Sequence, residues 1–188
     1  MSGHSRATVL FVPGLRDHVP GHWQSVLQAQ LPAAECVPRL GSNVLSCEAW
    51  VSALDRSIAA IEGPIVLVAH SAGVMMVAHW AGRHSRPIRG ALLATPPDFD
   101  SALPEGYPDP ETLRAAGWLP TPRAPLPFPS IVAASRNDPL ARVEKVAQLA
   151  RDWGSRLFDA GEVGHLNPAS GFGPWAASFA LVGELVGA

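Results

Sequence analysis

The sequence predicts a single-domain α/β fold, in which about six parallel strands form a sheet with helices on both faces. Six short apolar runs alternate along the chain with segments whose apolar residues recur at helical spacing. Such alternation calls for a parallel sheet that helices cover on both sides. The chain has 188 residues, 47% of them hydrophobic, so it is long enough to bury one good core. We therefore expect one domain over residues 1–188.

The predicted strands are short apolar runs that end at turn-forming or charged residues. The first run, ATVLFV, is followed by Pro13-Gly14, a dipeptide typical of turns. Its unbroken apolar character suits a strand that is buried on both faces. The predicted strands are 7–12, 34–38, 65–69, 88–95, 130–134 and 156–160.

The predicted helices lie between these runs. In the segment 47–61, Trp50, Leu54 and Ile58 recur every four residues, which predicts one apolar helix face. Ser46 stands where a helix N-cap is expected. The predicted helices are 22–31, 47–61, 74–80, 111–116, 139–153 and 175–186.

The segment 96–129 is rich in proline. It holds ten of the nineteen prolines, so little regular structure fits in it beyond the short helix 111–116. Composition alone also allows a disordered linker. The apolar side chains of the segment, among them Leu103, Tyr107 and Trp118, predict instead that it packs onto the domain as the rim of a pocket.

The stretch around Ser71 carries the strongest functional signal. The apolar run 65–69 leads into Ala69-His70-Ser71-Ala72-Gly73, and an apolar helix follows. Small residues on either side of the serine permit a sharp strand-to-helix turn with the hydroxyl at its apex, which is the nucleophile elbow with Ala69 in place of the first glycine. Serine is also a common helix N-cap, so the elbow depends on the strand and the helix around it.

Two further residues complete a candidate triad with Ser71. Asp138 follows the fifth predicted strand and His165 follows the sixth, and the order Ser, acid, His is the one expected of an α/β-hydrolase. Serine needs an imidazole to accept its proton, and a carboxylate fixes the tautomer of that imidazole. Alternatively, Asp138 before Pro139 is a good helix N-cap, and His165 is an ordinary loop histidine. The other carboxylates that could take the place of Asp138 are Asp98, Asp100 and Asp159.

An oxyanion hole would use two backbone N–H groups near Ser71. One comes from the residue after the nucleophile, here Ala72, and Leu15 after Pro13-Gly14 is the best candidate for the other, although it could simply form a turn. His18 and His22 have a metal-ligand spacing, but Pro20-Gly21 separates them, so we expect no metal. No G-x-G-x-x-G follows the first strand and no P-loop motif occurs, so we expect no cofactor.

Charge and composition argue against several other classes of function. A net charge of −2 without a basic run gives no footprint for nucleic acid or for a membrane surface. Cys36 and Cys47 form neither a disulfide framework nor a C-x-x-C pair, which favours a cytoplasmic protein. The first residues lack the features of a signal peptide, and no apolar run approaches the ~20 residues of a membrane span.

The chain resembles the small serine hydrolases related to retinoblastoma-binding protein 9. The motifs that carry the likeness are VPG (12–14), GHWQ (21–24), AHSAG (69–73), SRNDP (135–139) and GHLN (164–167). The resemblance implies a six-stranded parallel sheet without a large lid domain, a triad of Ser71, Asp138 and His165, and small ester or amide substrates. It also suggests that His22 and Trp23 stand near the active site, where His70 of the elbow would join them. Alternatively, His22 begins a helix and Trp23 packs in the core.

These residues predict a serine hydrolase of the carboxylesterase or amidase type (EC 3.1), which acts through an acyl-enzyme intermediate. Its partner would be a small-molecule substrate. The alternative is a non-catalytic protein that keeps the hydrolase fold and binds a protein partner through the proline-rich segment 96–129. The same triad also supports perhydrolase or C–C bond hydrolase chemistry, and the sequence does not separate these reactions.

Overall fold

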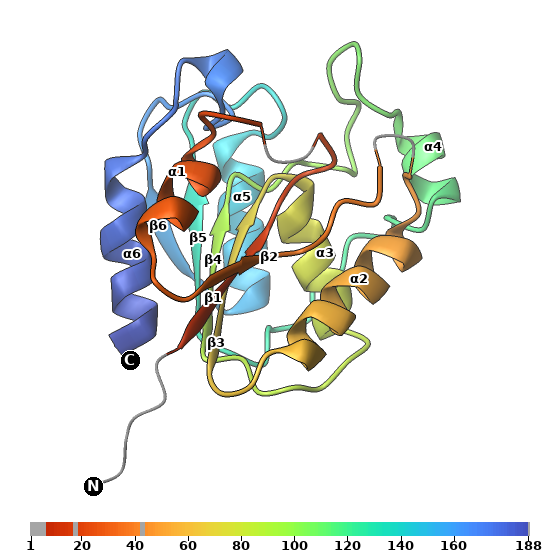
Figure 1. Cartoon of the computed structure of the whole chain (residues 1–188). Coiled ribbons are helices and arrows are strands. Elements are labelled where there is room, and N and C mark those ends of the chain that lie inside the picture. The colour runs from red at the N-terminus through yellow and green to blue at the C-terminus, as the bar shows by residue number, and fades with distance from the viewer. Residues whose placement is uncertain (1–6, 17–18, 42–43, 188) are drawn as a thin grey trace, which may run out of the picture.

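The computed structural model describes residues 7–16, 19–41 and 44–187, which build a six-stranded sheet with helices on both faces (Figure 1). All neighbouring strands are parallel, and their order is β2-β1-β3-β4-β5-β6. The strands are β1 (Thr8–Val12), β2 (Ala34–Cys36), β3 (Ile65–His70), β4 (Gly90–Ala94), β5 (Ser130–Ala134) and β6 (Arg156–Asp159). The predicted α/β class with six parallel strands is confirmed.

The helices form a layer on each side of the sheet. The α1 (Trp23–Gln30) and α6 (Ala176–Gly187) helices cover one face, whereas α2 (Cys47–Ala60), α3 (Ala72–Ala81) and α5 (Val143–Trp153) cover the other. The short α4 (Pro110–Ala115) and a 3₁₀ turn (Pro168–Ser170) lie in loops. None of the described helices combines the length and the apolar character that crossing a bilayer requires.

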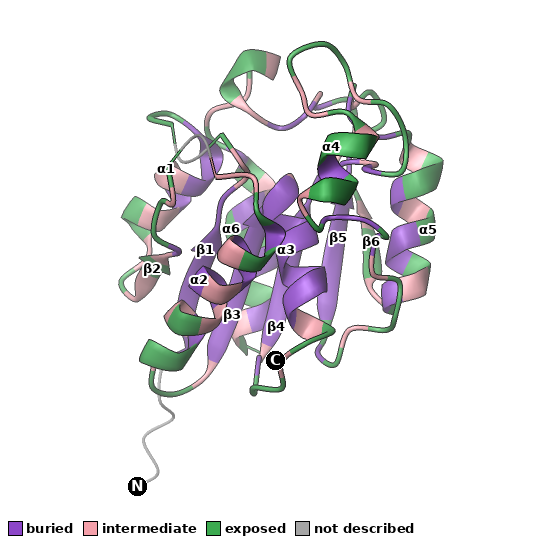
Figure 2. Cartoon of the chain, turned by 90° about the vertical axis from the view of Figure 1, so that its right-hand side faces the viewer, coloured by how far each residue is buried: buried purple, intermediate pink, exposed green. Residues whose placement is uncertain are grey.

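The central strands β1, β3, β4 and β5 are mostly apolar because both of their faces are covered, whereas the edge strands β2 and β6 carry the charged residues Glu35, Arg156 and Asp159. In β3, Leu67 and Ala69 pack in the core with α2 and α3, whereas Val66 and Val68 point to the opposite core with α1 and α6. This alternation follows from the two-residue repeat of a strand. All six residues of β3 are buried, and Figure 2 shows the same for the middle of the sheet. A mostly apolar run is therefore what the central strands need.

The proline-rich segment 96–129 packs down onto the domain, as predicted. Leu113 and Trp118 are fully buried in the core that also holds α2 and α3. Trp118 Nε1 donates to the carbonyl of Leu45 at 2.6 Å, and His79 Nε2 lies 3.0 Å from the carbonyl oxygen of Trp118. The expected short helix is present as α4, which Asp109 caps by accepting from the Thr112 N–H.

The fifth helix starts later than the sequence predicts. We expected it from residue 139, but α5 begins at Val143, with Arg142 in the N-cap position. The carboxylate of Asp138 accepts instead from the N–H of Leu140 at 2.9 Å and thereby holds a tight turn. The interpretation of Asp138 as the helix N-cap is therefore wrong. Of the other predicted elements, the fourth strand is shorter than expected, at Gly90–Ala94.

Candidate active site

Ser71 stands at the apex of the turn between β3 and α3 in a strained conformation. Its φ and ψ are 56° and −129°, values that a non-glycine residue rarely adopts. The turn is possible because Gly73 lacks a side chain: a Cβ there would lie 2.3 Å from the carbonyl oxygen of Val12. Ser71 occupies the N-cap position of α3, yet its side chain forms no capping hydrogen bond. Its hydroxyl is therefore available to the site rather than to the helix.

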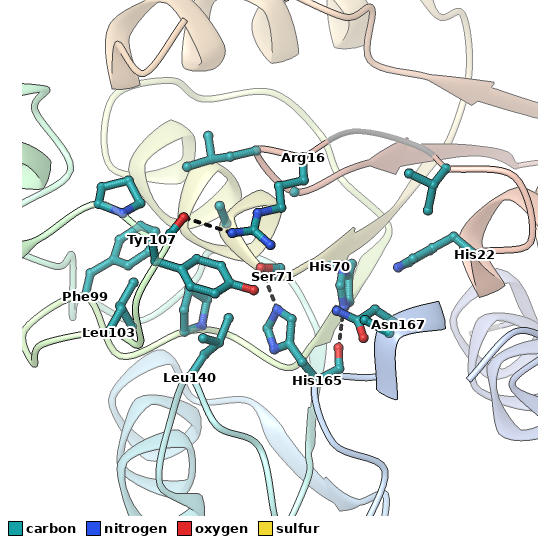
Figure 3. Close-up of a pocket in the computed structure, with 18 of the residues that line it drawn as sticks. Arg16, His22, His70, Ser71, Phe99, Leu103, Tyr107, Leu140, His165 and Asn167 are labelled. Carbon is teal, nitrogen blue, oxygen red and sulfur yellow. Dashed lines mark hydrogen bonds between the residues drawn. The ribbon is translucent and has the colours of Figure 1, made fainter. Parts of the chain in front are cut away.

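Ser71, His165 and Asp138 form a continuous hydrogen-bonded chain. Ser71 Oγ lies 2.8 Å from His165 Nε2, and His165 Nδ1 lies 2.9 and 3.0 Å from the two carboxylate oxygens of Asp138 (Figure 3 shows the Ser71 contact). The side chains of His165 and Asp138 are 4% and 1% exposed, so water competes little for these bonds. A carboxylate only accepts, so Nδ1 donates to it and Nε2 is left to accept the serine proton.

A neighbouring side chain, Asn137, joins the two loops that carry Asp138 and His165. Asn137 Oδ1 accepts from the N–H of Gly164 at 2.7 Å and from the hydroxyl of Ser135 at 3.0 Å. This contact fixes the loop after β5 against the loop after β6. No sequence-based prediction concerns the role of Asn137, although its place directly before the predicted acid was the available signal.

His165 is held from its backbone as well as from its ring. Its N–H donates to Ser170 Oγ at 3.0 Å, and its carbonyl oxygen lies 2.9 Å from Nε2 of His70. A carbonyl can only accept, so His70 donates from Nε2. The preceding Gly164 has φ +56°, and a Cβ there would lie 2.6 Å from Ser170 Cβ. The turn that presents His165 therefore requires glycine in this position.

A cavity of about 360 Å³ opens beside Ser71. This volume lies within the range of small-molecule sites, roughly 300–1,000 Å³. Much of the wall is apolar and comes from the proline-rich segment, including Phe99, Leu103 and Tyr107 (Figure 3). The cavity also receives side chains from the loop after β1 and from the loop after β6, among them Arg16 and Asn167. The rim from the proline-rich segment was predicted from the sequence, whereas Arg16 was not.

The predicted pocket residues separate into two groups. His22 and His70 line the cavity, and their rings lie 4.6 Å apart between centroids. His22 also caps α1, because its Nδ1 accepts from the Gln24 N–H at 3.2 Å. Trp23 does not line the cavity: it is 1% exposed and packs edge-on against Trp175 at 5.1 Å. The placement of Trp23 in the pocket is corrected to the alternative of core packing, since the first turn of α1 faces the α6 side of the sheet.

The profile of the serine hydrolase family matches residues 9–184. The chain belongs to this family of serine hydrolases. The sheet and the helices of this hydrolase are those of an α/β-hydrolase without a large lid domain. Among curated protein sequences, none matches the chain.

Solved structures similar to this hydrolase are themselves α/β-hydrolases. One is described as a YdeN-like hydrolase from Pectobacterium atrosepticum, with 28% identity over 97% of this chain and 91% of that chain, at a TM-score of 0.83. The ydeN gene product of Bacillus subtilis is 17% identical over 97% and 100%, with a TM-score of 0.78. The esterase domain of a Rhodothermus marinus protein is 15% identical over 98% and 89%, with a TM-score of 0.67. The two latter likenesses concern the fold alone.

The two backbone N–H groups predicted for an oxyanion hole lie at the hydrolase cavity. Leu15 and Ala72 both line it together with Ser71. Within the described part of the chain, neither N–H donates to another group. Gly14 lets the β1 loop approach Ser71 closely, because a Cβ on Gly14 would lie 3.2 Å from Ser71 Cβ.

The other carboxylates that could have paired with His165 are engaged elsewhere in the hydrolase. Asp98 accepts from the hydroxyl of Ser101 at 2.7 Å, and Asp100 pairs with Arg123 at 3.1 Å. Asp159 pairs with Arg136, whose guanidinium holds the pKa of that carboxyl below its usual value.

The structure gives no support to a metal centre in the part of the hydrolase that it describes. Among the described residues, no group of three or more His, Cys, Asp or Glu side chains is arranged so that it could hold a metal ion. The spacing of His18 and His22 in the sequence is that of a metal-ligand pair, but His18 lies outside the described residues.

Proposed function

We propose that this serine hydrolase cleaves small carboxylic esters or amides by acyl transfer, with Ser71 as nucleophile, His165 as general base and Asp138 as the group that orients His165. The observation that carries the proposal is the unbroken hydrogen-bonded chain from Ser71 Oγ to the carboxylate of Asp138. The Ser71 end of this series of hydrogen bonds lies at the wall of a cavity that accommodates a small substrate. Of these two substrate classes we propose esters as the main one, which corresponds to class EC 3.1.

The proposed reaction begins when Ser71 Oγ attacks the substrate carbonyl carbon while His165 Nε2 takes the hydroxyl proton. The oxyanion of the tetrahedral intermediate accepts hydrogen bonds from the N–H groups of Ala72 and Leu15. The intermediate collapses when the alcohol or amine leaves with the proton from His165. A water molecule then attacks the acyl-enzyme with His165 again as base, and the acid and free Ser71 result. Asp138 stays ionised and stabilises the imidazolium in both steps.

We also propose that the hydrolase is related to retinoblastoma-binding protein 9 and that residues 1–188 act as one catalytic domain. Support for the relation comes from the GHWQ, SRNDP and GHLN motifs, which lie at the start of α1 and in the two loops that carry Asp138 and His165. A cytoplasmic location and the absence of a nucleic-acid partner stay predictions from the sequence.

Labelling with a fluorophosphonate probe tests the proposal directly. Wild-type protein should label and hydrolyse p-nitrophenyl acetate, and Ser71→Ala should lose the label and about 10⁶-fold in kcat. Ser52→Ala is a matched control, because Ser52 lies on α2 and bonds to Glu48 outside the cavity. If Ser71→Ala hydrolyses the ester as fast as the wild type, after contamination is excluded, the mechanism is wrong.

The alternative of a non-catalytic interaction protein has less support. Its binding surface would be the segment 96–129, yet the large apolar side chains Leu113 and Trp118 of that segment are buried in the domain. An unlabelled wild-type protein that retains a protein partner through this segment would favour the alternative. Perhydrolase or C–C hydrolase activity would instead leave the Ser71 label intact and appear only with the corresponding substrates.

A further inference from the structure

The cavity has one side chain with a permanent charge among its described lining residues, and it is Arg16. The other ionisable groups among the described lining residues are Tyr107 and histidines, and none of these described residues is an Asp, Glu or Lys. Arg16 forms no ion pair with a described residue. The side of the cavity that carries Arg16 is therefore cationic, whereas most of the remaining wall is apolar.

The guanidinium of Arg16 is held in place by the proline-rich segment. Its Nη2 donates to the carbonyl of Gly106 at 2.9 Å, and its Cζ lies 4.1 Å from the centre of the Tyr107 ring. Figure 3 shows the guanidinium extending over the cavity next to Tyr107, on the side of Ser71. One of the five N–H donors of a guanidinium is used in this way, so the others remain for a ligand. Stacking on an aromatic ring fixes the plane of the group without neutralising its charge.

We propose that Arg16 binds a carboxylate of the substrate, so that the preferred substrates are esters or amides that carry a second, ionised carboxyl group a few bonds from the scissile carbonyl. This inference rests on the proposed function, since it names the substrate class of the same site. A guanidinium fork matches a planar carboxylate, and such charge-assisted bonds are stronger than neutral ones. Arg16 is exposed, so a carboxylate bound there keeps part of its hydration while it gains the charge-assisted bond.

The apolar side chains of the wall suit a hydrocarbon portion of the substrate. Leu45, Leu103 and Leu140 line the cavity together with Ser71 and Arg16. A dicarboxylic half-ester presents a neutral ester at one end, an apolar middle and an anion at the other end. The ester corresponds to Ser71 and the anion to Arg16, and the hydrocarbon part meets the apolar lining of the cavity. Tyr107 acts here as a positioning residue, because its ring supports the guanidinium.

Matched ester pairs test the proposal. In the first pair, mono-p-nitrophenyl glutarate is compared with p-nitrophenyl valerate, which places the carboxylate on the acyl group. In the second pair, 4-acetoxybenzoate is compared with 4-methylphenyl acetate, which places it on the leaving group. We expect the wild type to prefer the anionic ester in at least one pair. Arg16→Gln should reduce the ratio of kcat/KM for the anionic ester to kcat/KM for its neutral counterpart about 10- to 100-fold.

Control variants separate binding of the anion from support of the fold. Arg16→Lys, which keeps the charge but not the fork, should restore part of the ratio. Arg114→Gln should leave the ratio unchanged, because Arg114 is exposed on α4 and does not line the cavity. The proposal is overturned if the wild type shows no preference in either pair, or if Arg16→Gln lowers kcat/KM equally for both members of each pair.

Binding to an inactive variant distinguishes this inference from the proposed function. In Ser71→Ala, calorimetric titration should show monomethyl glutarate binding more tightly than dimethyl glutarate. A further Arg16→Gln change should abolish that difference. If hydrolysis proves independent of Ser71 while this difference holds, the proposed function fails and the carboxylate site stands. If hydrolysis depends on Ser71 but the two compounds bind alike, the carboxylate site fails alone.

Discussion

The two walls of the cavity are built in different ways. On one side, Ser71, Asp138 and His165 each follow a strand of the same sheet and are bonded to one another. On the other side, the apolar wall comes from the segment 96–129, which has one short helix and is fixed through a few anchors such as Trp118. Parallel strands bring their carboxyl ends to one edge of the sheet, so the topology alone assembles the first wall. The second wall depends on loop packing, and this is the side on which substrate preference can change while the chemistry is kept.

After Ser71→Ala, the largest effect expected on the strand side is that of Asp138→Asn. The amide preserves the shape but offers a donor to His165, which favours the wrong imidazole tautomer, so kcat for p-nitrophenyl acetate should fall about 10⁴-fold. Asp159→Asn is the matched control, since Asp159 ends β6 but pairs with Arg136 instead of His165. Steady-state kinetics on both variants check this prediction. Equal losses of kcat in Asp138→Asn and Asp159→Asn would mean that Asp138 does not orient His165.

The elbow itself should be the least tolerant part of the strand side. Gly73→Ala places a Cβ 2.3 Å from the Val12 carbonyl oxygen and 2.7 Å from that of Pro13, and both are backbone atoms. The free energy of unfolding should fall by about 2–4 kcal/mol, as measured by urea denaturation. Gly183→Ala in α6 meets no atom within 4 Å and should stabilise the protein by about 0.5–1 kcal/mol. The two substitutions should therefore change the free energy of unfolding in opposite directions. A Gly73→Ala variant as stable as the wild type would contradict the close contact between the end of β1 and the start of α3.

The sequence predicts the strand side far better than the loop side. The β5 strand lies at Ser130–Ala134, where the alternation of apolar runs predicts it. The elbow motif identifies Ser71 because the turn has room only for small residues such as Gly73. The start of α5 was mispredicted because two local roles of Asp138, helix cap and partner of His165, look alike in sequence. Arg16 and Gly106 are 90 positions apart, and no periodicity links two loops. Their contact therefore emerges only when the chain is folded.

On the loop side, Leu103→Ala should change substrate preference rather than chemistry. Leu103 is half-buried and lines the cavity, so its truncation removes apolar wall without emptying the core. The kcat/KM value for p-nitrophenyl hexanoate should fall about tenfold, while the value for the acetate changes little. Leu157→Ala is the control, because Leu157 is 44% exposed on β6 and lies outside the cavity lining. Equal losses on both esters would show that Leu103 supports the site and not the acyl chain.

The smallest effect concerns the anchor between the two sides, where His79 of α3 meets the carbonyl of Trp118. Burial lowers the pKa of His79 below its usual value of 6.5, and Arg83 lowers it further, while the Trp118 contact opposes the shift. The unfolded chain therefore binds a proton at a higher pH than the native chain does. Stability is retained above about pH 6.5 and is lost as the pH falls below that value towards the lowered pKa of the native state.

Thermal unfolding between pH 7.5 and 5.5 measures this loss. The Tm of the wild type should fall over this interval as His79 takes up a proton on unfolding. His79→Gln keeps a donor for the Trp118 carbonyl but does not titrate, so its Tm should depend less on pH over the same interval. Parallel Tm curves for the two proteins would exclude His79 as the source. A shallower curve for the variant would identify His79, at the attachment of the proline-rich segment, as a source of the loss of stability in acid.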